Sequence, residues 1–244
     1  MCGRYTHNLT WTDLISLYRL TLPEAAPAQA KPTWNAAPTQ PLPIVRPTGD
    51  GLGRELIIAG WGLIPNWLKN LDGKAMSTIN ARCESVREKP TFRESFERRR
   101  CIVPATGWYE WQPAGTRKRP IYMQPRTPFA FAGIWDRWSG PGVPGIVSYA
   151  IVTTDAAASI GAYHPRMPVV LEAGHWDQWM LGTPDEAAAL MRPYDGAIEA
   201  WEVAARVGSP KYNDPELIKP VTAAMAGAPK PKPAPKPAAI GTLL

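Results

Sequence analysis

The most distinctive chemistry in this sequence belongs to Cys2, which directly follows the initiator methionine. Removal of Met1, which is usual when a small residue comes next, gives Cys2 a free α-amine beside its thiol. The two groups lie on adjacent carbons and form a 1,2-aminothiol, which no other position in a chain can offer. The alternative is an incidental thiol in a frayed terminus, since chain ends are commonly poorly ordered. Cys2 alone does not decide between these interpretations.

Asn80 and Arg82 form a second candidate pair, in the stretch STINARCE (77–84). They stand two residues apart, so an extended strand directs both side chains to the same face. The spacing predicts one surface that carries a neutral amide and a cation.

Glu110 lies inside the aromatic run GWYEW (107–111). A strand that faced it inward would press the carboxylate against apolar neighbours. Desolvation would then raise its pKa toward the range used in acid–base catalysis. Strand alternation equally allows an outward-facing glutamate between inward-facing aromatic residues.

His164 and Arg166 come just before an apolar run in YHPRMPVVL (163–171). The proline after His164 restricts that residue to an extended conformation and so holds it in a fixed loop. A single histidine is more often structural or exposed than catalytic. A catalytic role for His164 therefore depends on what lies beside it.

Two loops made rigid by proline carry tryptophan, WNAAPTQPLP (34–43) and WGLIPNW (61–67). Rigid loops that expose tryptophan can stack on unpaired bases, at about 1–3 kcal/mol per base. The alternative is that these tryptophans pack in the core, which is the ordinary use of tryptophan. Taken by themselves, the two loop sequences favour this alternative.

The elements that must position these residues are mostly short strands separated by Gly/Pro turns. We expect strands at 42–45, 55–61, 101–105, 107–111, 120–124, 129–135, 147–154 and 167–171. We expect helices at 10–20, with Thr12 or Thr10 as the cap, and at 91–99, 174–181 and 183–191. Strands and helices do not alternate regularly, which argues against a doubly wound parallel fold. The pattern predicts one α+β domain with a curved antiparallel, β-barrel-like sheet flanked by short helices.

Composition narrows the class of protein further. The 244 residues are 45% apolar, which suffices for a core, and the 28 prolines argue against a helical bundle. Three cysteines without a CxxC pair argue against a disulfide scaffold and a structural zinc site, as in a reducing cytosol. No apolar run reaches about 18 residues, and no export signal is present. We expect a cytoplasmic protein with no membrane association.

The last residues form a separate segment. Residues 223–244 are rich in Pro, Ala and Lys, cannot build a core, and predict a disordered tail beyond a domain of residues 1–222. Three lysines of this tail account for half of the net charge of +6, which leaves +3 on residues 1–222. Bulk charge alone is therefore no sign of a nucleic-acid binder.

Eight motifs in collinear order resemble the SRAP family of abasic-site processing proteins. They are MCGRY, WNAAPT, WGLIPNW, INARCE, CIVPATGWYEW, FAFAGIWD, VTT and HPRMPVVL, and they span roughly residues 1–222. The resemblance implies a single domain around a curved β-barrel-like sheet that recognises abasic sites in single-stranded DNA during the DNA damage (SOS) response. We expect a monomer that needs no cofactor or metal and associates with the nucleoid when bound to DNA.

The resemblance also implies roles for individual residues. The catalytic positions are Cys2, which crosslinks to the sugar, Asn80, which supports it, Glu110, the acid–base group, and His164, the catalytic histidine. The DNA-binding positions are Arg4, Arg82 and Arg166 at phosphates, with Pro38 and Trp67 where the strand bends. One departure is Cys83, which stands where a small residue is expected but lacks an adjacent amine.

The chemistry implied for Cys2 is covalent. Its amine, with a reference pKa near 7.7–8.0, attacks C1′ of the ring-opened sugar to give a Schiff base. Its thiol then closes a five-membered thiazolidine, which is favoured because the step is intramolecular. We therefore expect lyase-like chemistry, and a hydrolase (peptidase) activity by which the chain removes its own Met1.

Two other classes of protein share part of this pattern. MCG also begins class II glutamine amidotransferases, whose N-terminal cysteine attacks an amide, but INAR, WYEW and HPRMP are not their motifs. A non-covalent single-stranded DNA-binding protein would use the same tryptophans and arginines. It would leave Glu110 and His164 unexplained.

Overall fold

A computed structural model describes residues 2–21, 27, 30–71, 78–140 and 142–221. The predicted boundary at residue 222 and the tail 223–244 lie outside these residues. The strands in the described part of the chain are β1 (Tyr5–His7), β2 (Thr33–Ala36), β3 (Pro41–Pro47), β4 (Arg54–Trp61), β5 (Asn80–Arg82), β6 (Arg100–Ala105), β7 (Gly107–Ala114), β8 (Arg117–Pro125), β9 (Phe129–Gly140), β10 (Val143–Asp155), β11 (Arg166–Pro168), β12 (Val170–Glu172) and β13 (Ile198–Glu202). The helices are α1 (Trp11–Tyr18), α2 (Arg93–Arg98), α3 (Trp176–Leu181) and α4 (Pro184–Ala188), with 3-10 turns η1 (Ala173–His175), η2 (Ala205–Gly208) and η3 (Pro215–Ile218).

Five strands close into a barrel. β10 pairs with β4, β4 with β3, β3 with β6, β6 with β9, and β9 returns to β10. β11 and β12 extend this sheet along β10 and β9, while β5 lies beside β10. The predicted barrel-like α+β fold is confirmed, although β10 runs parallel to both β4 and β5, so the sheet is mixed.

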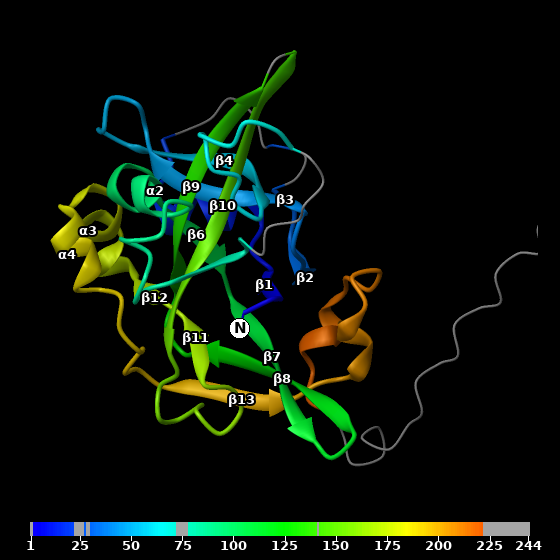
Figure 1. Ribbon diagram of the computed structural model, residues 1–244. Helices are drawn as coiled ribbons and strands as arrows, with labels where there is room; N and C mark the ends of the chain where they lie inside the picture. Colours follow the sequence, from blue (N-terminus) through cyan, green and yellow to red (C-terminus); the bar gives the residue numbers. More distant parts are fainter. Residues whose placement is uncertain (1, 22–26, 28–29, 72–77, 141, 222–244) are drawn as a thin grey trace, which may run out of the picture.

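A second sheet packs against the barrel and carries the start of the chain. Its order is β13-β8-β7-β1-β2, all antiparallel, and β1 therefore lies between β7 and β2 (Figure 1). One apolar cluster joins both sheets, with Tyr5 and Trp108 from the second sheet against Trp61 and Phe131 of the barrel. The residues at the beginning of β1 are thus held at the junction of the two sheets.

Side-chain caps define where two helices begin. Thr10 accepts from the backbone amide of Asp13, whose carboxylate accepts from the Thr10 amide, so Thr10 rather than Thr12 caps α1. Thr183 and Glu186 form the same capping box at α4. Both predicted helices are confirmed, and α2 and α3 fall within the other two predicted segments.

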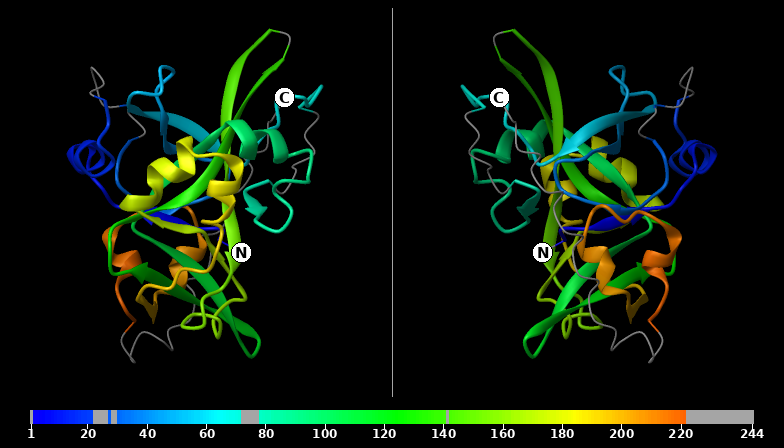
Figure 2. Two further views of the ribbon diagram at one scale, coloured as in Figure 1. Left: turned by 90° about the vertical axis from the view of Figure 1, so that its left-hand side faces the viewer. Right: turned by 90° about the vertical axis from the view of Figure 1, so that its right-hand side faces the viewer.

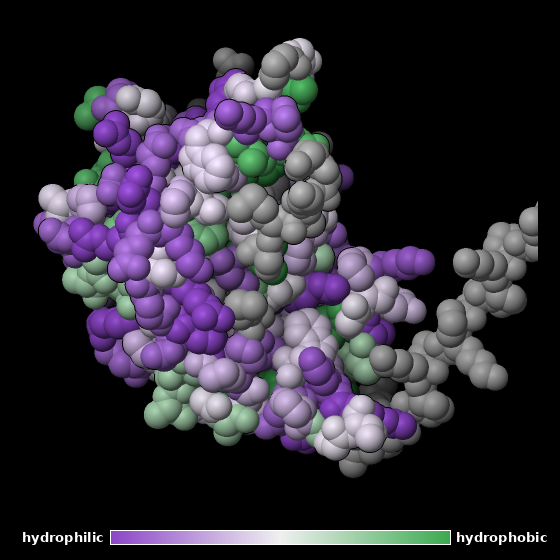
Figure 3. All heavy atoms as spheres, in the orientation of Figure 1, coloured by the Kyte–Doolittle hydropathy of each residue, from purple (hydrophilic) through white to green (hydrophobic). Residues whose placement is uncertain are grey.

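The long β9–β10 hairpin projects from the body of the molecule (Figures 1 and 2). The face seen in Figure 3 is mostly hydrophilic, with hydrophobic residues in small groups. Within the described ranges, no helix has the length and apolar character needed to cross a bilayer.

His7, in β1, predicts an acid-dependent loss of stability. It is fully buried, and burial lowers its pKa to about 4. Because an unfolded histidine titrates near 6.5, the unfolded chain binds the proton first, and His7 destabilises the fold by about 3 kcal/mol as pH falls from 6.5 to 4. In urea unfolding, the free energy of unfolding of wild type should therefore fall by about 3 kcal/mol relative to that of His7→Gln between pH 6.5 and pH 4. A difference between the two proteins that does not change with pH would contradict the assignment.

Candidate active site

Cys2 is anchored rather than frayed. It is fully buried in the apolar cluster that joins the two sheets, and its carbonyl oxygen accepts a 2.8 Å hydrogen bond from Asn80 Nδ2. Burial, with the nearby Glu110 carboxylate, raises the pKa of the Cys2 thiol. The thiol is therefore protonated at neutral pH, and its reaction as a nucleophile requires a base.

Asn80 comes from β5, whose pairing with β10 fixes its position. The side chain is 9% exposed, and its Oδ1 has no hydrogen-bond partner among the described residues. The amide holds Cys2 through its NH₂ group while this acceptor stays available. Arg82, two residues on, lies in the same strand and is exposed, so the strand carries a buried amide and a cation at the surface.

Glu110 faces inward from β7. Trp108, two residues earlier on the same strand, belongs to the apolar cluster that contains Cys2, whereas Tyr109 packs in a separate cluster on the opposite face. Glu110 is 2% exposed, and burial raises the pKa of its carboxyl to about 7. Of the two orientations that the sequence allowed, the structure has the inward one. A carboxyl with this pKa can both accept and donate a proton near neutral pH.

His164 precedes β11 and faces Glu110, with Nε2 3.9 Å from Glu110 Oε2. Its Nδ1 lies 3.0 Å from the amide nitrogen of Arg166 and 2.9 Å from the carbonyl oxygen of the same residue. The amide suits a neutral ring that accepts at Nδ1, and the carbonyl suits a ring that donates from Nδ1. Burial lowers the pKa of His164. The loop can hold this ring in either protonation state.

Arg166 is tied down by carboxylates. Its guanidinium pairs with both oxygens of Glu84, with Asp155 Oδ1 at 2.8 Å, and with the carbonyl of Thr153. The side chain is 14% exposed. These contacts hold the guanidinium in place beside His164.

Arg4 lies at the other side of Cys2, just before β1. Its guanidinium donates to Asn35 Oδ1 at 2.7 Å and to the carbonyls of Val207 and Gly208 at 2.8 and 3.3 Å. Arg4 is half-buried. Among the described residues, no acceptor is paired with its Nε or its fourth Nη hydrogen.

The predicted stacking residues lie in loops. Trp67 is 51% exposed, and its indole N–H donates to the carbonyl of Pro90 at 3.1 Å. It lines a shallow depression with Pro90, Arg93 and Glu94. Pro38 is half-buried in the turn after β2. Trp61, by contrast, is buried in the core, as the core-packing alternative predicts.

The contacts therefore bring together Cys2, Asn80, Glu110 and His164. A comparison with family models matches residues 1–210 to the family described as SOS response associated peptidase (SRAP). The chain belongs to the SRAP family.

Relatives cover almost the whole chain. Abasic site processing protein YoqW of Bacillus subtilis (strain 168) is 35% identical over 228 residues, which are 90% of this chain and 99% of that protein. Abasic site processing protein HMCES of Mus musculus is 28% identical over 240 residues, covering 82% of this chain and 68% of that protein. A crystal structure of a protein from Bacteroides thetaiotaomicron superposes with a TM-score of 0.77 at 26% identity, covering 91% and 100% of the two chains.

Some residues of this SRAP site were not found from the sequence. Glu84 and Asp155 hold Arg166, and Asn35 holds Arg4. Glu84 lies in the motif INARCE and Asn35 lies in the motif WNAAPT, but neither motif indicates which residue the side chain contacts. Asp155 is brought near by the antiparallel pairing of β10 with β11.

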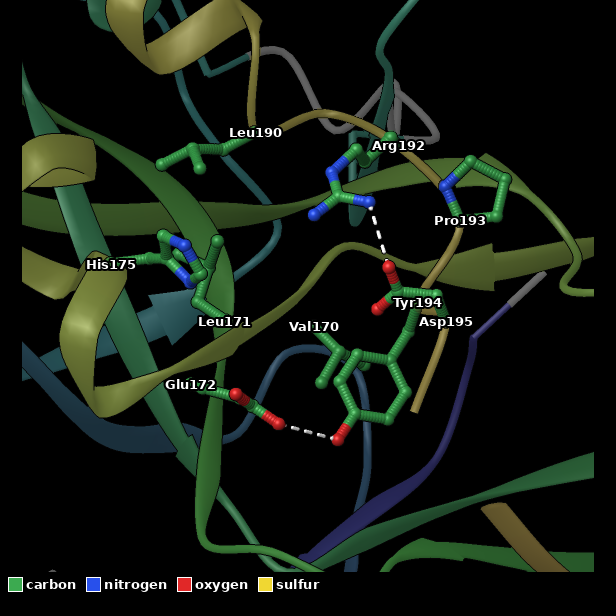
Figure 4. Close-up of a pocket in the computed structure, with 9 residues that line it drawn as sticks. All are labelled: Val170, Leu171, Glu172, His175, Leu190, Arg192, Pro193, Tyr194 and Asp195. Atoms are coloured by element: carbon green, nitrogen blue, oxygen red, sulfur yellow. Dashed lines mark hydrogen bonds and ion pairs between the residues drawn. The ribbon is translucent and has the colours of Figure 1, made fainter. Parts of the chain in front are cut away.

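A second pocket of the SRAP domain holds none of the predicted site residues. It is shown in Figure 4 and lined by Val170, Leu171, Glu172, His175, Leu190, Arg192, Pro193, Tyr194 and Asp195. Tyr194 donates to Glu172 at 2.8 Å, and Arg192 pairs with Asp195 at 3.0 Å, so these groups are satisfied within the protein. In the part of the chain that the structure describes, no group of three His, Cys, Asp or Glu residues could hold a metal ion.

Proposed function

We propose that this protein processes abasic sites in single-stranded DNA by forming a covalent thiazolidine through Cys2. The relatives' names, which refer to abasic-site processing, and membership of the SRAP family support the substrate class. The observation that carries the proposal is the hydrogen bond from Asn80 to the Cys2 carbonyl, which fixes a residue at the very start of the chain beside Glu110. A frayed terminal thiol would need no such support.

The reaction starts once Met1 has been removed. Hydrolysis of the Met1–Cys2 peptide bond consumes one water, and we assign this hydrolysis to the chain itself. It is consistent with the word peptidase in the family description. The product carries an amine and a thiol on adjacent carbons of Cys2.

Crosslinking then takes two bond-forming steps. The Cys2 amine attacks C1′ of the open-chain sugar aldehyde, and loss of one water gives an imine. The Cys2 sulfur next bonds to C1′, and the thiol proton passes to the imine nitrogen, which closes the five-membered ring. The second step is intramolecular and is favoured over release for that reason.

The neighbouring side chains fit the proton transfers of these steps. His164 can donate a proton to the ring oxygen of the closed sugar and so help to open it. Glu110, with a pKa of about 7, can take protons from the amine and thiol and return one to the leaving water. Asn80 holds the Cys2 backbone without adding charge to the site.

The DNA would meet the protein through phosphates and bases. We assign phosphate contacts to Arg4, Arg82 and Arg166, and stacking at the bend to Pro38 and Trp67. The exposure of Trp67 and Arg82 supports this assignment, since both are accessible to a strand. Local cations can bind DNA even when the net charge is modest.

The proposal is tested by incubating the protein with single-stranded DNA that contains uracil, together with uracil glycosylase. The products are resolved on a denaturing gel. We expect a slower-migrating protein–DNA species that survives denaturation. The mass of the purified chain should show that Met1 is absent. A chain without Met1 that yields no covalent species would overturn the proposal, and binding without crosslinking would favour a non-covalent single-stranded DNA-binding protein.

Arg82→Gln should weaken DNA binding in a salt-dependent way. Each phosphate contact on single-stranded DNA contributes about 0.7 to the slope of log K against log salt concentration, because counterions are released. Removing Arg82 should therefore reduce the slope by about 0.7, measured by fluorescence anisotropy. Arg126→Gln is the matched control, since Arg126 is also an exposed arginine and pairs with Glu199 of β13. Equal slopes for Arg82→Gln and wild type would remove Arg82 from the interface.

A further inference from the structure

A segment near the end of the described chain clamps the strand that follows Cys2. η2 and the residues after it pack beside β1 and β2 (Figure 1). Arg4 reaches this segment directly, since it donates to the carbonyls of Val207 and Gly208. The first residues of the chain are therefore held by residues about 200 positions later.

Asn35 is the centre of this clamp. It is 2% exposed, its Oδ1 accepts from Arg4 at 2.7 Å, and its Nδ2 lies within hydrogen-bond distance of the carbonyls of Val207, Ser209 and Tyr212, at 3.3, 3.1 and 2.8 Å. Only a side-chain amide offers both an acceptor for a cation and donors for carbonyls in so small a volume. Replacement by another side chain would leave buried polar groups without partners.

The clamp leads to the reactive residue through the backbone. The carbonyl oxygen of Arg4 accepts from the amide of Tyr109 at 3.0 Å and lies 3.9 Å from Cys2 Sγ. Tyr109 is adjacent to Glu110. Holding Arg4 therefore fixes Cys2 relative to the strand that carries Glu110, at a place where a chain would otherwise fray.

We propose that Asn35 is a positioning residue for the reaction of Cys2. Acting through Arg4, it locks the start of the chain onto the segment from Val207 to Tyr212 and so keeps the Cys2 amine and thiol in line with the sugar. This inference rests on the proposed function, since its effect is on crosslinking. Asn35 is uncharged and buried, so it acts on placement and makes no phosphate contact of its own.

The test separates DNA binding from chemistry. Asn35→Asp keeps the shape and the acceptor for Arg4 but loses the NH₂ donors and brings a carboxylate toward three carbonyls. Affinity is measured with single-stranded DNA carrying a tetrahydrofuran site, which cannot open to an aldehyde. Crosslinking is measured as a single-turnover rate at saturating abasic DNA. Small misplacements of reacting groups can cost about 100-fold in rate, so we expect a loss of at least about 10-fold in crosslinking rate. Because the rate is measured at saturating DNA, loss of the one phosphate contact assigned to Arg4, which would lower the salt slope by about 0.7, does not enter it.

Asn213→Asp is the matched control. Asn213 also joins β2 to the same segment, accepting from the Trp34 amide at 2.7 Å and the Thr33 hydroxyl at 3.1 Å, but it does not contact Arg4. We expect it to crosslink at close to the wild-type rate. Asn35→Ser is the second variant if Asn35→Asp fails to fold, as judged by circular dichroism. It adds no charge but cannot reach both Arg4 and the three carbonyls, and we expect the same loss of rate.

The outcomes are distinct. Slower crosslinking at saturating DNA by an Asn35 variant, together with a normal Asn213 variant, supports the positioning role. Equal slowing by the Asn35 and Asn213 variants shows a general effect on stability and overturns it. Weaker affinity with a normal rate also overturns it. If wild type itself gives no crosslink, the proposed function fails instead.

Discussion

Cys2→Ala should give no stable covalent product with abasic single-stranded DNA. The variant keeps an N-terminal amine after Met1 is removed, so it can still form an imine, but it has no thiol to close the ring. An imine hydrolyses on denaturation, whereas a thiazolidine survives. The measurement is the fraction of DNA shifted on a denaturing gel, which we expect to fall from most of the DNA to background.

Cys2→Ser refines this result, because it retains the amine and replaces sulfur with a poorer nucleophile. Borohydride added during the reaction should trap its imine as a stable amine, while untreated samples show no band. Cys83→Ala is the control thiol variant. Cys83 is half-buried and lacks an adjacent amine, so its loss should leave the crosslink unchanged. A stable product from Cys2→Ala, or its loss in Cys83→Ala, would contradict the role given to Cys2.

The local elements of the fold could be predicted because their signals are local. The run FAFAGIW lies within β9, and the helix expected at 10–20 is α1, capped by Thr10, one of the two threonines considered. Closure of the barrel could not be predicted, because it depends on β9 pairing with both β6 and β10. The parallel pairing of β10 with β4 and β5 joins segments remote in sequence.

The candidate site was predicted in part for the same reason. Glu110 could be recognised as a candidate acid–base group. The direction of its side chain could not be predicted, because it depends on β7 lying between β1 and β8, with apolar clusters on both faces. Arg166 could be singled out as a cation, yet its two carboxylate partners come from residues 82 and 11 positions away. Residue types indicated what each group can do, and long-range packing determines what it contacts.

The burial of the site explains why a base is needed. Burial raises the pKa of the Cys2 thiol, which suppresses the thiolate and protects it from unspecific reaction. The same environment raises the pKa of Glu110 to about 7. The thiol is thus less reactive on its own, while the nearby carboxyl is tuned to exchange protons at neutral pH.

Glu110→Gln should slow crosslinking and flatten its pH dependence. As the pH rises through about 7, Glu110 in wild type loses its proton and becomes a base, so the rate should rise over that range. Glutamine has the same shape but cannot titrate. General acid–base groups contribute about 10²- to 10⁴-fold, and we expect a loss of this order in the single-turnover rate at pH 7.5. Affinity for tetrahydrofuran-containing DNA should change little.

Glu110→Gln should be more stable than wild type although it crosslinks more slowly. A gain in stability excludes misfolding as the cause of the slower reaction. An unfolded glutamate titrates near 4.5 and folded Glu110 near 7, so the unfolded chain releases its proton first as pH rises, and Glu110 costs the wild-type fold about 3 kcal/mol between those values. Urea unfolding of Glu110→Gln should therefore show a gain relative to wild type that grows from pH 4.5 to 7. This trend opposes that of His7, so wild-type stability should vary less with pH than that of either single variant. A Glu110→Gln protein that crosslinks at the wild-type rate would remove the carboxyl from the mechanism, and a pH-independent stability difference would show that its pKa is not raised by burial.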